Sequence, residues 1–336
     1  MDARRDRPTS PPSPGAPAPQ PVTASARPES GGPAGVPHLD RLGTEHARAD
    51  LADLDTRSTR EVVAVLAAAD AEVPAVVAAA GDAIAAAVDL VVDGMARGGR
   101  LVYVGAGTPG RLALVDASEV PPTYGTDPGL VVGVMAGGPG ALQAAREGVE
   151  DDEEAGAADV TALGVGPADV VVGISASGRT PYVLAAVAAA RAAGARTVGV
   201  SSNEGAELSA VVDVAVEVPT GPEVVAGSTR LKAGTAQKLV LHQISTATMV
   251  RRGRVLGPHM VDVRATNAKL RRRAVRIVVG ATGTDEATAT AALDAVGGHA
   301  GTAVVVVLAG VDAARAQELM AGAGGVVRRA LDAARG

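Results

Sequence analysis

Short runs rich in valine alternate with turns and helical patterns along this 336-residue chain, and this alternation constrains the fold most strongly. Short apolar runs alternating with helices are typical of a parallel sheet covered by helices on both faces. The predicted fold is therefore α/β, a doubly wound parallel five-stranded sheet flanked by helices. The predicted strands cover residues 101–104, 130–134, 169–174, 196–200 and 212–218.

Helical patterns precede the sheet, connect its strands and continue after it. Gly98 and Gly99 end the second of them, because glycine favours a helix stop. We expect three parts: a disordered Pro- and Ala-rich tail at 1–37, the sheet domain at 38–273, and a small helical domain at 274–336. The predicted helices cover 58–69, 75–96, 111–117, a stretch from Ala141, 181–193, 229–252, 285–296, 302–309, 313–321 and 326–334.

Composition excludes several classes of function. The chain has no Phe and no Trp, so Ala, Val and Leu must fill the core, and a base-stacking surface for nucleic acid is lacking. The net charge of −6, without an evident basic stripe, argues against nucleic acid and anionic membranes as partners. The absence of cysteine excludes disulfides, thiolate metal sites and a cysteine nucleophile, and fits a reducing compartment.

Nothing in the sequence predicts a membrane or secreted protein. The longest apolar stretch, 73–95, is interrupted by Asp82, Asp89 and Asp93, which favour an amphipathic helix. The charged first residues run into prolines without the apolar core of a signal peptide. We expect a cytoplasmic protein with no membrane partner.

Two turns after predicted strands have the residues of an anion site. The segment 105–111, Gly-Ala-Gly-Thr-Pro-Gly-Arg, fits the glycine fingerprint of dinucleotide folds, but no carboxylate ends the next strand, which makes a nicotinamide site a poor match. A tight turn that merely needs glycine is the alternative. Ser175, Ser177 and Thr180 place three hydroxyls before a helix, which suits a phosphate monoester, whereas a simple helix cap needs only one.

Carboxylates at 116–119 and 147–154 belong to neighbouring βα units. Loops at the carboxyl ends of parallel strands converge on one crevice, so these groups could act there as acid and base. The alternative for the second segment is a solvated helix end. A divalent metal is a further possibility, but the spacing matches no calcium loop. The five histidines form no metal-binding pattern, and no G-x-S-x-G elbow predicts a serine hydrolase.

At these residues the sequence resembles the N-acetylmuramic acid 6-phosphate etherases, a family of the sugar isomerase (SIS) superfamily. The resemblance extends over residues 39–335 and implies an SIS-type sheet domain with a C-terminal helical domain. Thr44-Glu45 and Leu54-Asp55 resemble the family's N-terminal segment. The matching segments are 101–108, 111–119, 132–142, 147–151, 173–182, 227–238, 260–267 and 281–287.

The resemblance implies a carbon–oxygen lyase that removes D-lactate from N-acetylmuramic acid 6-phosphate by elimination and then hydration, leaving N-acetylglucosamine 6-phosphate. Such an enzyme serves amino-sugar catabolism and cell-wall recycling, without metal or other cofactor, as a homodimer whose crevice the second subunit completes. Motif matching gives the general acid as Glu119 and the base as Glu150. The residues expected to bind the phosphosugar are Gly107, Thr108, Ser175, Ser177, Gly178 and Thr180.

One position departs from the family pattern, which usually has Ser where this chain has Pro109. Proline lacks both the hydroxyl and the N–H, so one polar contact to the substrate is lost or replaced. Two alternatives share the fold: a non-catalytic sugar-phosphate sensor, which needs no acid–base pair, and an aldose–ketose isomerase. The presence of both glutamates favours an enzyme, and the segments 227–238 and 260–267 favour the etherase over the isomerase.

Overall fold

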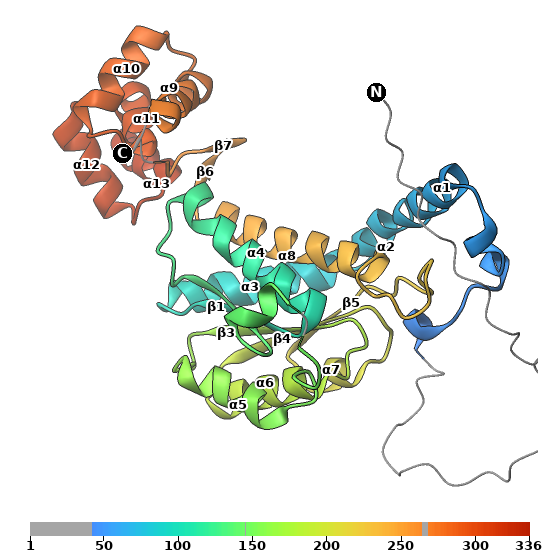
Figure 1. Ribbon diagram of the computed structural model, residues 1–336. Coiled ribbons are helices and arrows are strands. Elements are labelled where there is room, and N and C mark those ends of the chain that lie inside the picture. The colour runs from blue at the N-terminus through green and yellow to red at the C-terminus, as the bar shows by residue number, and fades with distance from the viewer. Residues whose placement is uncertain (1–41, 145, 264–267) are drawn as a thin grey trace, which may run out of the picture. The chain divides into compact units, whose positions relative to one another are not determined.

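The computed structural model describes residues 42–144, 146–263 and 268–336 (Figure 1). The predicted tail at 1–37 lies outside the described residues, and so do the last four residues of the matched segment 260–267. Residues 38–336 form one compact unit, so a division into two domains at residue 273 stays a prediction.

The predicted parallel sheet is confirmed. Its five strands are all parallel to their neighbours and lie in the order β2-β1-β3-β4-β5. Because the chain moves outward in one direction from β1 and in the other from β3, the order reverses between these two strands. The strands are β1 (Leu101–Gly105), β2 (Val131–Met135), β3 (Val170–Ser175), β4 (Arg196–Ser201) and β5 (Val214–Glu217).

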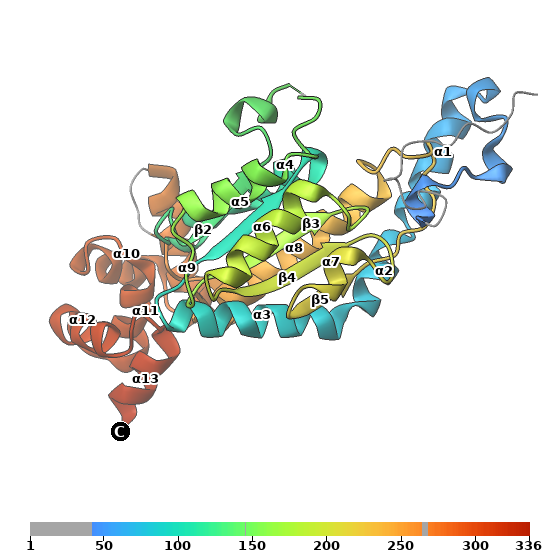
Figure 2. The same ribbon diagram turned by 90° about the horizontal axis from the view of Figure 1, so that it is seen from below.

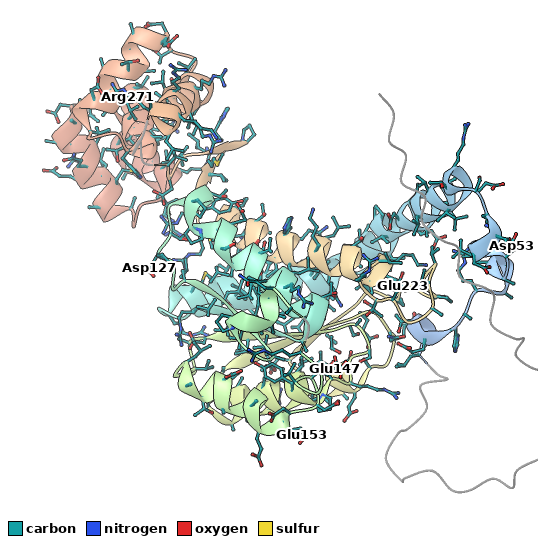
Figure 3. The ribbon with its side chains drawn as sticks, viewed as in Figure 1. Asp53, Asp127, Glu147, Glu153, Glu223 and Arg271 are labelled. Carbon is teal, nitrogen blue, oxygen red and sulfur yellow. The ribbon has the colours of Figure 1, made fainter. Side chains whose placement is uncertain are left out.

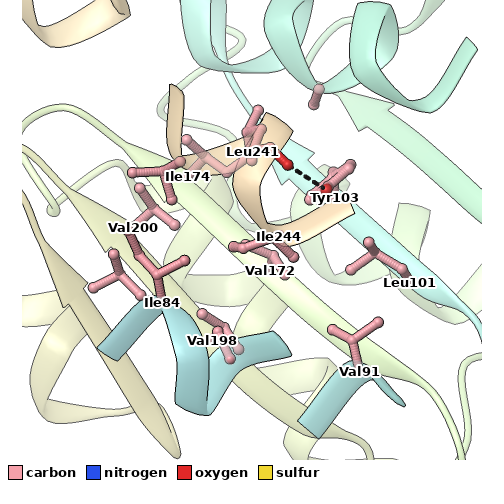
Figure 4. Packing of buried hydrophobic residues seen from close by; sticks show 14 of the residues in the cluster. Ile84, Val91, Leu101, Tyr103, Val172, Ile174, Val198, Val200, Leu241 and Ile244 are labelled. Atoms are coloured by element: carbon pink, nitrogen blue, oxygen red, sulfur yellow. Dashed lines mark hydrogen bonds between the residues drawn. The ribbon is translucent and has the colours of Figure 1, made fainter. Parts of the chain in front are cut away.

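Helices cover both faces of the sheet, as Val-rich strands without alternation require. One face packs against the helices α2 (Val73–Ala79), α3 (Gly81–Ala96), α4 (Gly107–Tyr124) and α8 (Lys232–Arg251). Figure 4 shows this core, in which Tyr103 is fully buried and donates a hydrogen bond to the carbonyl oxygen of Leu241. The other face packs against α5 (Glu153–Ala162), α6 (Pro181–Ala192) and α7 (Glu207–Ala210), which cross the sheet in Figure 2.

Three predicted helices differ from the observed ones. The stretch 75–96 is two helices, because the chain turns at Ala80 between α2 and α3. The helix predicted at 111–117 extends to Tyr124 despite Pro121 and Pro122, each of which removes one backbone hydrogen bond from its last turns, and a left-handed Gly125 caps it. The stretch from Ala141 contains only the end of a short 3-10 helix, Pro139–Leu142, and α5 starts at Glu153, where Asp152 caps it.

The C-terminal part is helical as predicted, with a separate core. Two elements in it were missed by the sequence analysis: the short hairpin β6 (Val255–Leu256) and β7 (His259–Met260), and the helix α9 (Ala268–Thr282). The start of α9 is rich in Arg, so the expectation that the chain has no basic stripe is wrong. The remaining helices are α10 (Glu286–Ala295), α11 (Ala300–Ala309), α12 (Ala313–Gly322) and α13 (Val327–Arg335).

One stretch has the length and composition of a membrane span. Residues Thr59–Ala79 have a mean hydropathy of 1.9 over the most apolar window, of which 17% is buried. The stretch consists of α1 (Thr59–Asp70) and α2, separated by a turn that contains Glu72. Neither helix alone reaches the roughly 20 residues that a bilayer core requires, so the membrane expectation stays as predicted from the sequence.

Candidate functional site

The segment from Ser175 to Thr180, here called the hydroxyl turn, connects β3 to α6. The Ser175 hydroxyl is its centre, 2.7 Å from the Thr180 hydroxyl, 3.3 Å from the Ser177 hydroxyl, and an acceptor for the Gly178 N–H at 2.9 Å. Gly178 has a positive φ, and a Cβ atom there would lie 2.4 Å from the Cβ of Ala206, so only glycine fits. The structure therefore brings together four of the predicted binding residues.

Asn203 fixes this turn from the neighbouring strand. Its buried amide donates to the carbonyl oxygen of Ala176 at 2.9 Å and to the Thr44 hydroxyl at 3.3 Å. The carbonyl oxygen of fully buried Thr44 accepts in turn from the Gly227 N–H at 3.4 Å. The sequence analysis missed Asn203, although its place just after β4, at the same edge of the sheet, was a usable signal.

The glycine turn after β1 lies next to the hydroxyl turn. Gly105 pairs with Ile174, which immediately precedes Ser175, so the two turns leave adjacent strands at the carboxyl edge. Gly107 and Thr108 form the first residues of α4, where backbone N–H groups have no partner within the helix. Both turns flank the point where the strand order reverses, which is where open α/β sheets bind ligands.

Close packing explains part of the glycine pattern. A Cβ atom on Gly110 would lie 2.6 Å from the Gly105 carbonyl oxygen, so strand and helix approach each other only because both residues are glycine. Gly107 has a positive φ, as the alternative of a tight turn that needs glycine expects. That alternative does not account for the hydroxyl of Thr108, which is half-buried at the start of α4.

Glu150 is fixed beside the hydroxyl turn through its backbone. Its carbonyl oxygen accepts from the Tyr182 N–H at 3.0 Å, two residues after Thr180. Tyr182 is itself buried, and its hydroxyl donates to Asp159 at 2.6 Å; burial and this bond raise the Tyr182 pKa. The Glu150 side chain is exposed and has no hydrogen bond or ion pair with any described residue.

Glu119 lies on α4, twelve residues after Gly107 and therefore about 18 Å along the helix axis. Its side chain is exposed and has no hydrogen-bond or ion-pair partner in the described part of the chain. No contact between described residues of a single chain joins the Glu119 and Glu150 carboxylates. Their assignment as acid and base stays a prediction.

Comparison with known proteins decides the family. A family model described as SIS domain matches residues 147–247, and one described as glucokinase regulatory protein N-terminal SIS domain matches residues 83–191. N-acetylmuramic acid 6-phosphate etherase from Rubrobacter xylanophilus is 54% identical over 293 residues, which cover 87% of this chain and 97% of that protein. The etherase of Streptomyces avermitilis is 52% identical and covers 88% of this chain and 95% of that protein.

The chain belongs to the N-acetylmuramic acid 6-phosphate etherase family. Its five-stranded sheet with two anion-type turns at one edge is thus the SIS sheet of an etherase-family member. A solved phosphoheptose isomerase from Francisella tularensis is a looser likeness, 19% identical, with a TM-score of 0.47, covering 58% of this chain and all of that chain.

A buried carboxylate of the etherase family segment 111–119 faces α8 rather than solvent. Asp116 accepts from the Ser245 hydroxyl at 3.0 Å and lies 3.8 Å from the Nε2 atom of His242. Burial raises the Asp116 pKa, against the opposing effects of Tyr103, Ser245 and His242. Asp116 thus joins α4, which carries Glu119, to α8.

The start of α8, inside the etherase family segment 227–238, is capped by a residue that lies nine positions earlier in the sequence. Glu223 is fully buried, and its two carboxylate oxygens accept from the N–H groups of Lys232 at 2.9 Å and Ala233 at 3.0 Å. The Lys232 ammonium, also buried, pairs with Glu72 at 3.2 Å. No local sequence signal reveals Glu223, because a helix cap normally lies within three residues of the helix.

Two other features of the described residues bear on the ligand. A hollow of about 550 Å³ between α4 and β2 is lined mainly by apolar side chains such as Val115 and Leu142, which suits a phosphorylated sugar poorly. Among residues 42–144, 146–263 and 268–336, no three His, Asp or Glu side chains gather as metal ligands do. The expectation of a reaction without a metal stays a prediction.

Proposed function

We propose that this chain is a carbon–oxygen lyase that cleaves the D-lactyl ether of N-acetylmuramic acid 6-phosphate, giving N-acetylglucosamine 6-phosphate and D-lactate. The observation that carries the proposal is the 54% identity to an etherase over nearly the whole of that protein. The adjacent turns at the reversal of strand order support it, because they supply hydroxyls and free N–H groups for a phosphate.

The proposed reaction needs one base and one acid. In the ring-opened sugar the C1 aldehyde acidifies the C2 hydrogen, and Glu150 removes it as a proton. The C3–O bond then breaks, and Glu119 protonates the departing lactyl oxygen. Water adds to the resulting alkene, which restores a hydroxyl at C3 and returns a proton at C2. General acid–base groups of this kind each contribute about 10²- to 10⁴-fold to rate.

The two phosphate-side turns would hold the substrate while this chemistry proceeds. Gly107 and Thr108 offer N–H groups at the start of α4, and Ser175, Ser177 and Thr180 keep spare hydrogen-bonding capacity, since a hydroxyl can accept twice and donate once. Gly178 allows the turn to close. No residue of this set requires a cofactor.

Two copies of the chain would be needed for a complete site. Glu119 and Glu150 are both exposed and unpartnered within the described part of one chain. A second copy that covers one of them would exclude water and place an acid opposite a base. We therefore propose a homodimer, acting in the cytoplasm, with no nucleic-acid or membrane partner.

The direct test is release of D-lactate from N-acetylmuramic acid 6-phosphate by the purified chain. Glu119→Gln is expected to block release while the C2 hydrogen still exchanges with D₂O, because proton abstraction precedes C–O cleavage. Glu150→Gln should abolish both. A matched control is Glu204→Gln, which alters an exposed carboxylate on another loop at the same sheet edge and should leave turnover unchanged.

Two outcomes would contradict the proposal. If the wild-type chain exchanges the C2 hydrogen but releases no lactate, the result would support the aldose–ketose isomerase alternative. If it binds the sugar phosphate without hydrogen exchange or lactate release, the result would support the non-catalytic sensor alternative. The match to the family model described as glucokinase regulatory protein N-terminal SIS domain is the reason to test for this outcome. Wild-type turnover in both glutamine variants would refute the residue roles alone.

A further inference from the structure

The start of α9 presents a basic face that no step of the proposed reaction uses. Lys269, Arg272, Arg273 and Arg276 are exposed and follow the helical spacing i, i+3, i+4, i+7, so they point to one side; they are here called the basic face. The opposite side of α9 is buried in the C-terminal core. An open hollow of about 1060 Å³ runs along the basic face and contains a single carboxylate, that of Glu286.

These four cations form no ion pair with any described residue, although the Glu286 carboxylate lines the same hollow. Arg271, beside them, pairs with Asp294, whereas no side chain of the basic face forms a hydrogen bond with any residue of 42–144, 146–263 or 268–336. Members three or four residues apart on a helix have Cβ atoms about 5–6 Å apart, within the roughly 8 Å over which salt screens charges, so neighbouring members repel one another. An anionic partner would relieve that repulsion.

The chain also carries an unpaired surface of the opposite sign. Residues 147–154, here called the acidic run, contain six carboxylates in eight positions, all exposed. Figure 3 labels Glu147 and Glu153 in this run and Arg271 on α9. None of the six forms an ion pair with a described residue. Asp152 caps α5, and Glu153 and Glu154 suit its first turn, but these local roles leave the other three unexplained.

We propose that the basic face of α9 binds the acidic run of a second copy of this chain. The inference rests on the proposed homodimer and names one of its contacts. In a two-fold symmetric dimer such a contact occurs twice, so at each of two places four exposed cations meet the five carboxylates of the acidic run other than Glu150, which the proposed reaction leaves to the substrate. The contact would also bring the basic face of one copy to the segment that holds Glu150 of the other.

Charge favours a second copy over nucleic acid as the occupant. The chain has a net charge of −6, so outside the basic face it repels a phosphate backbone. It has no Phe or Trp to stack on bases. The acidic run, by contrast, is available at the same concentration as the basic face in every solution of the protein.

Charge reversal tests the contact. One variant carries Arg272→Glu and Arg273→Glu, and the other carries Glu153→Lys and Glu154→Lys; neither touches Glu150 or the α5 cap. Each alone should raise the dimer dissociation constant about tenfold or more at low salt, measured by sedimentation velocity over a dilution series. An equimolar mixture should recover wild-type association, because in the mixed dimer one contact is reversed in both partners and the other is wild type.

A third chain that combines all four substitutions should also dimerise as the wild type does. Recovery in this combined chain but not in the mixture would place the contact within one chain and overturn the inference. Wild-type association in both two-residue variants would also overturn the inference. So would duplex DNA binding by the wild type that the α9 variant loses. A monomeric wild type would refute the dimer and this contact together, while lactate release judges the proposed function separately.

Discussion

The hydroxyl turn and the two glutamates differ in how many of their contacts are made within one chain. The hydroxyl turn is connected throughout: Ser175 bonds to Thr180 and Gly178, and Asn203 ties Ala176 to Thr44. Glu119 and Glu150 are fixed only through the backbone, and their carboxylates contact no described side chain. Under the proposed function, one chain therefore supplies the phosphate-binding turn complete, whereas the acid–base chemistry would depend on what covers the two glutamates.

Mixing two inactive variants tests this difference with the largest expected effect. If each site takes Glu119 from one copy and Glu150 from the other, a dimer of Glu119→Gln with Glu150→Gln contains one intact site. Random exchange makes half of the dimers mixed, so lactate release should rise from almost none to about a quarter of the wild-type rate. The measurement is lactate release after the variants are unfolded and refolded together.

The contrary result has a clear meaning. If both glutamates of a site come from one chain, no mixed dimer contains an intact site and activity stays at the level of the separate variants. Wild-type protein treated in the same way provides the control for refolding.

The hydroxyl turn should show its role in substrate affinity. Ser175→Ala removes the hydroxyl that accepts from Gly178 and contacts Thr180, so the turn loses its centre as well as a phosphate contact. Hydrogen bonds to charged groups contribute about 1.5–3 kcal/mol, so KM should rise about 10- to 100-fold while kcat changes less. Ser209→Ala, at a half-buried position on α7, is the control, and a fall in kcat at constant KM would contradict the assigned role.

Most of the fold was readable from the sequence because the strands are short, apolar and evenly separated by helices. All five strands begin and end within one residue of their predicted positions except at the start of β5, which differs by two residues. The errors fall where local pattern and tertiary context disagree. Alanine continues through residue 80 without a pattern break, so the turn between α2 and α3 was missed, and the polar start of α9 hid a helix whose stability comes from one buried face.

The site was only partly readable for a different reason. Ser175, Ser177 and Thr180 are close in the chain, so their convergence follows from one turn. Asn203 and Glu223 act across loops, on residues 27 and nine positions away, and no local rule connects such pairs. In the proposed homodimer, the meeting of Glu119 with Glu150 would need a second copy, which the sequence of one chain does not specify.

The opposite edge of the sheet contains a carboxylate that is fully partnered, and it should affect stability instead of activity. Asp169 accepts from the Arg100 N–H at 2.7 Å, the Arg100 side chain at 2.9 Å and the Gly166 N–H at 3.0 Å. Burial opposes ionisation, but these bonds outweigh it and lower the Asp169 pKa. Asp169→Asn should cost about 1–3 kcal/mol of unfolding free energy at pH 7, with KM unchanged.

The lowered pKa of Asp169 also predicts how its contribution to stability changes with pH. Because the folded pKa lies below the unfolded value of about 3.9, the ionised Asp169 stabilises the fold above that pH and loses its contribution as the pH falls through the folded pKa. The difference between wild type and Asp169→Asn in urea unfolding should therefore be constant from pH 7 to about 5 and shrink below about 4. A difference that grows on acidification would contradict the assignment.

The smallest expected effect concerns Pro109, the position where the family resemblance led us to expect Ser. Pro109 is the third residue of α4, where a helix has no internal use for an N–H, so the proline costs the helix nothing. It does remove a donor beside Gly107 and Thr108, at the turn proposed to bind phosphate. Pro109→Ser should restore an N–H and a hydroxyl there and lower KM by about two- to tenfold, the range for one neutral hydrogen bond, with unchanged kcat. Pro109→Ala, which restores the N–H alone, separates the two donors. An unchanged KM in both variants would show that the glycine turn acts in packing, and the hydroxyl turn would then bind the phosphate without it.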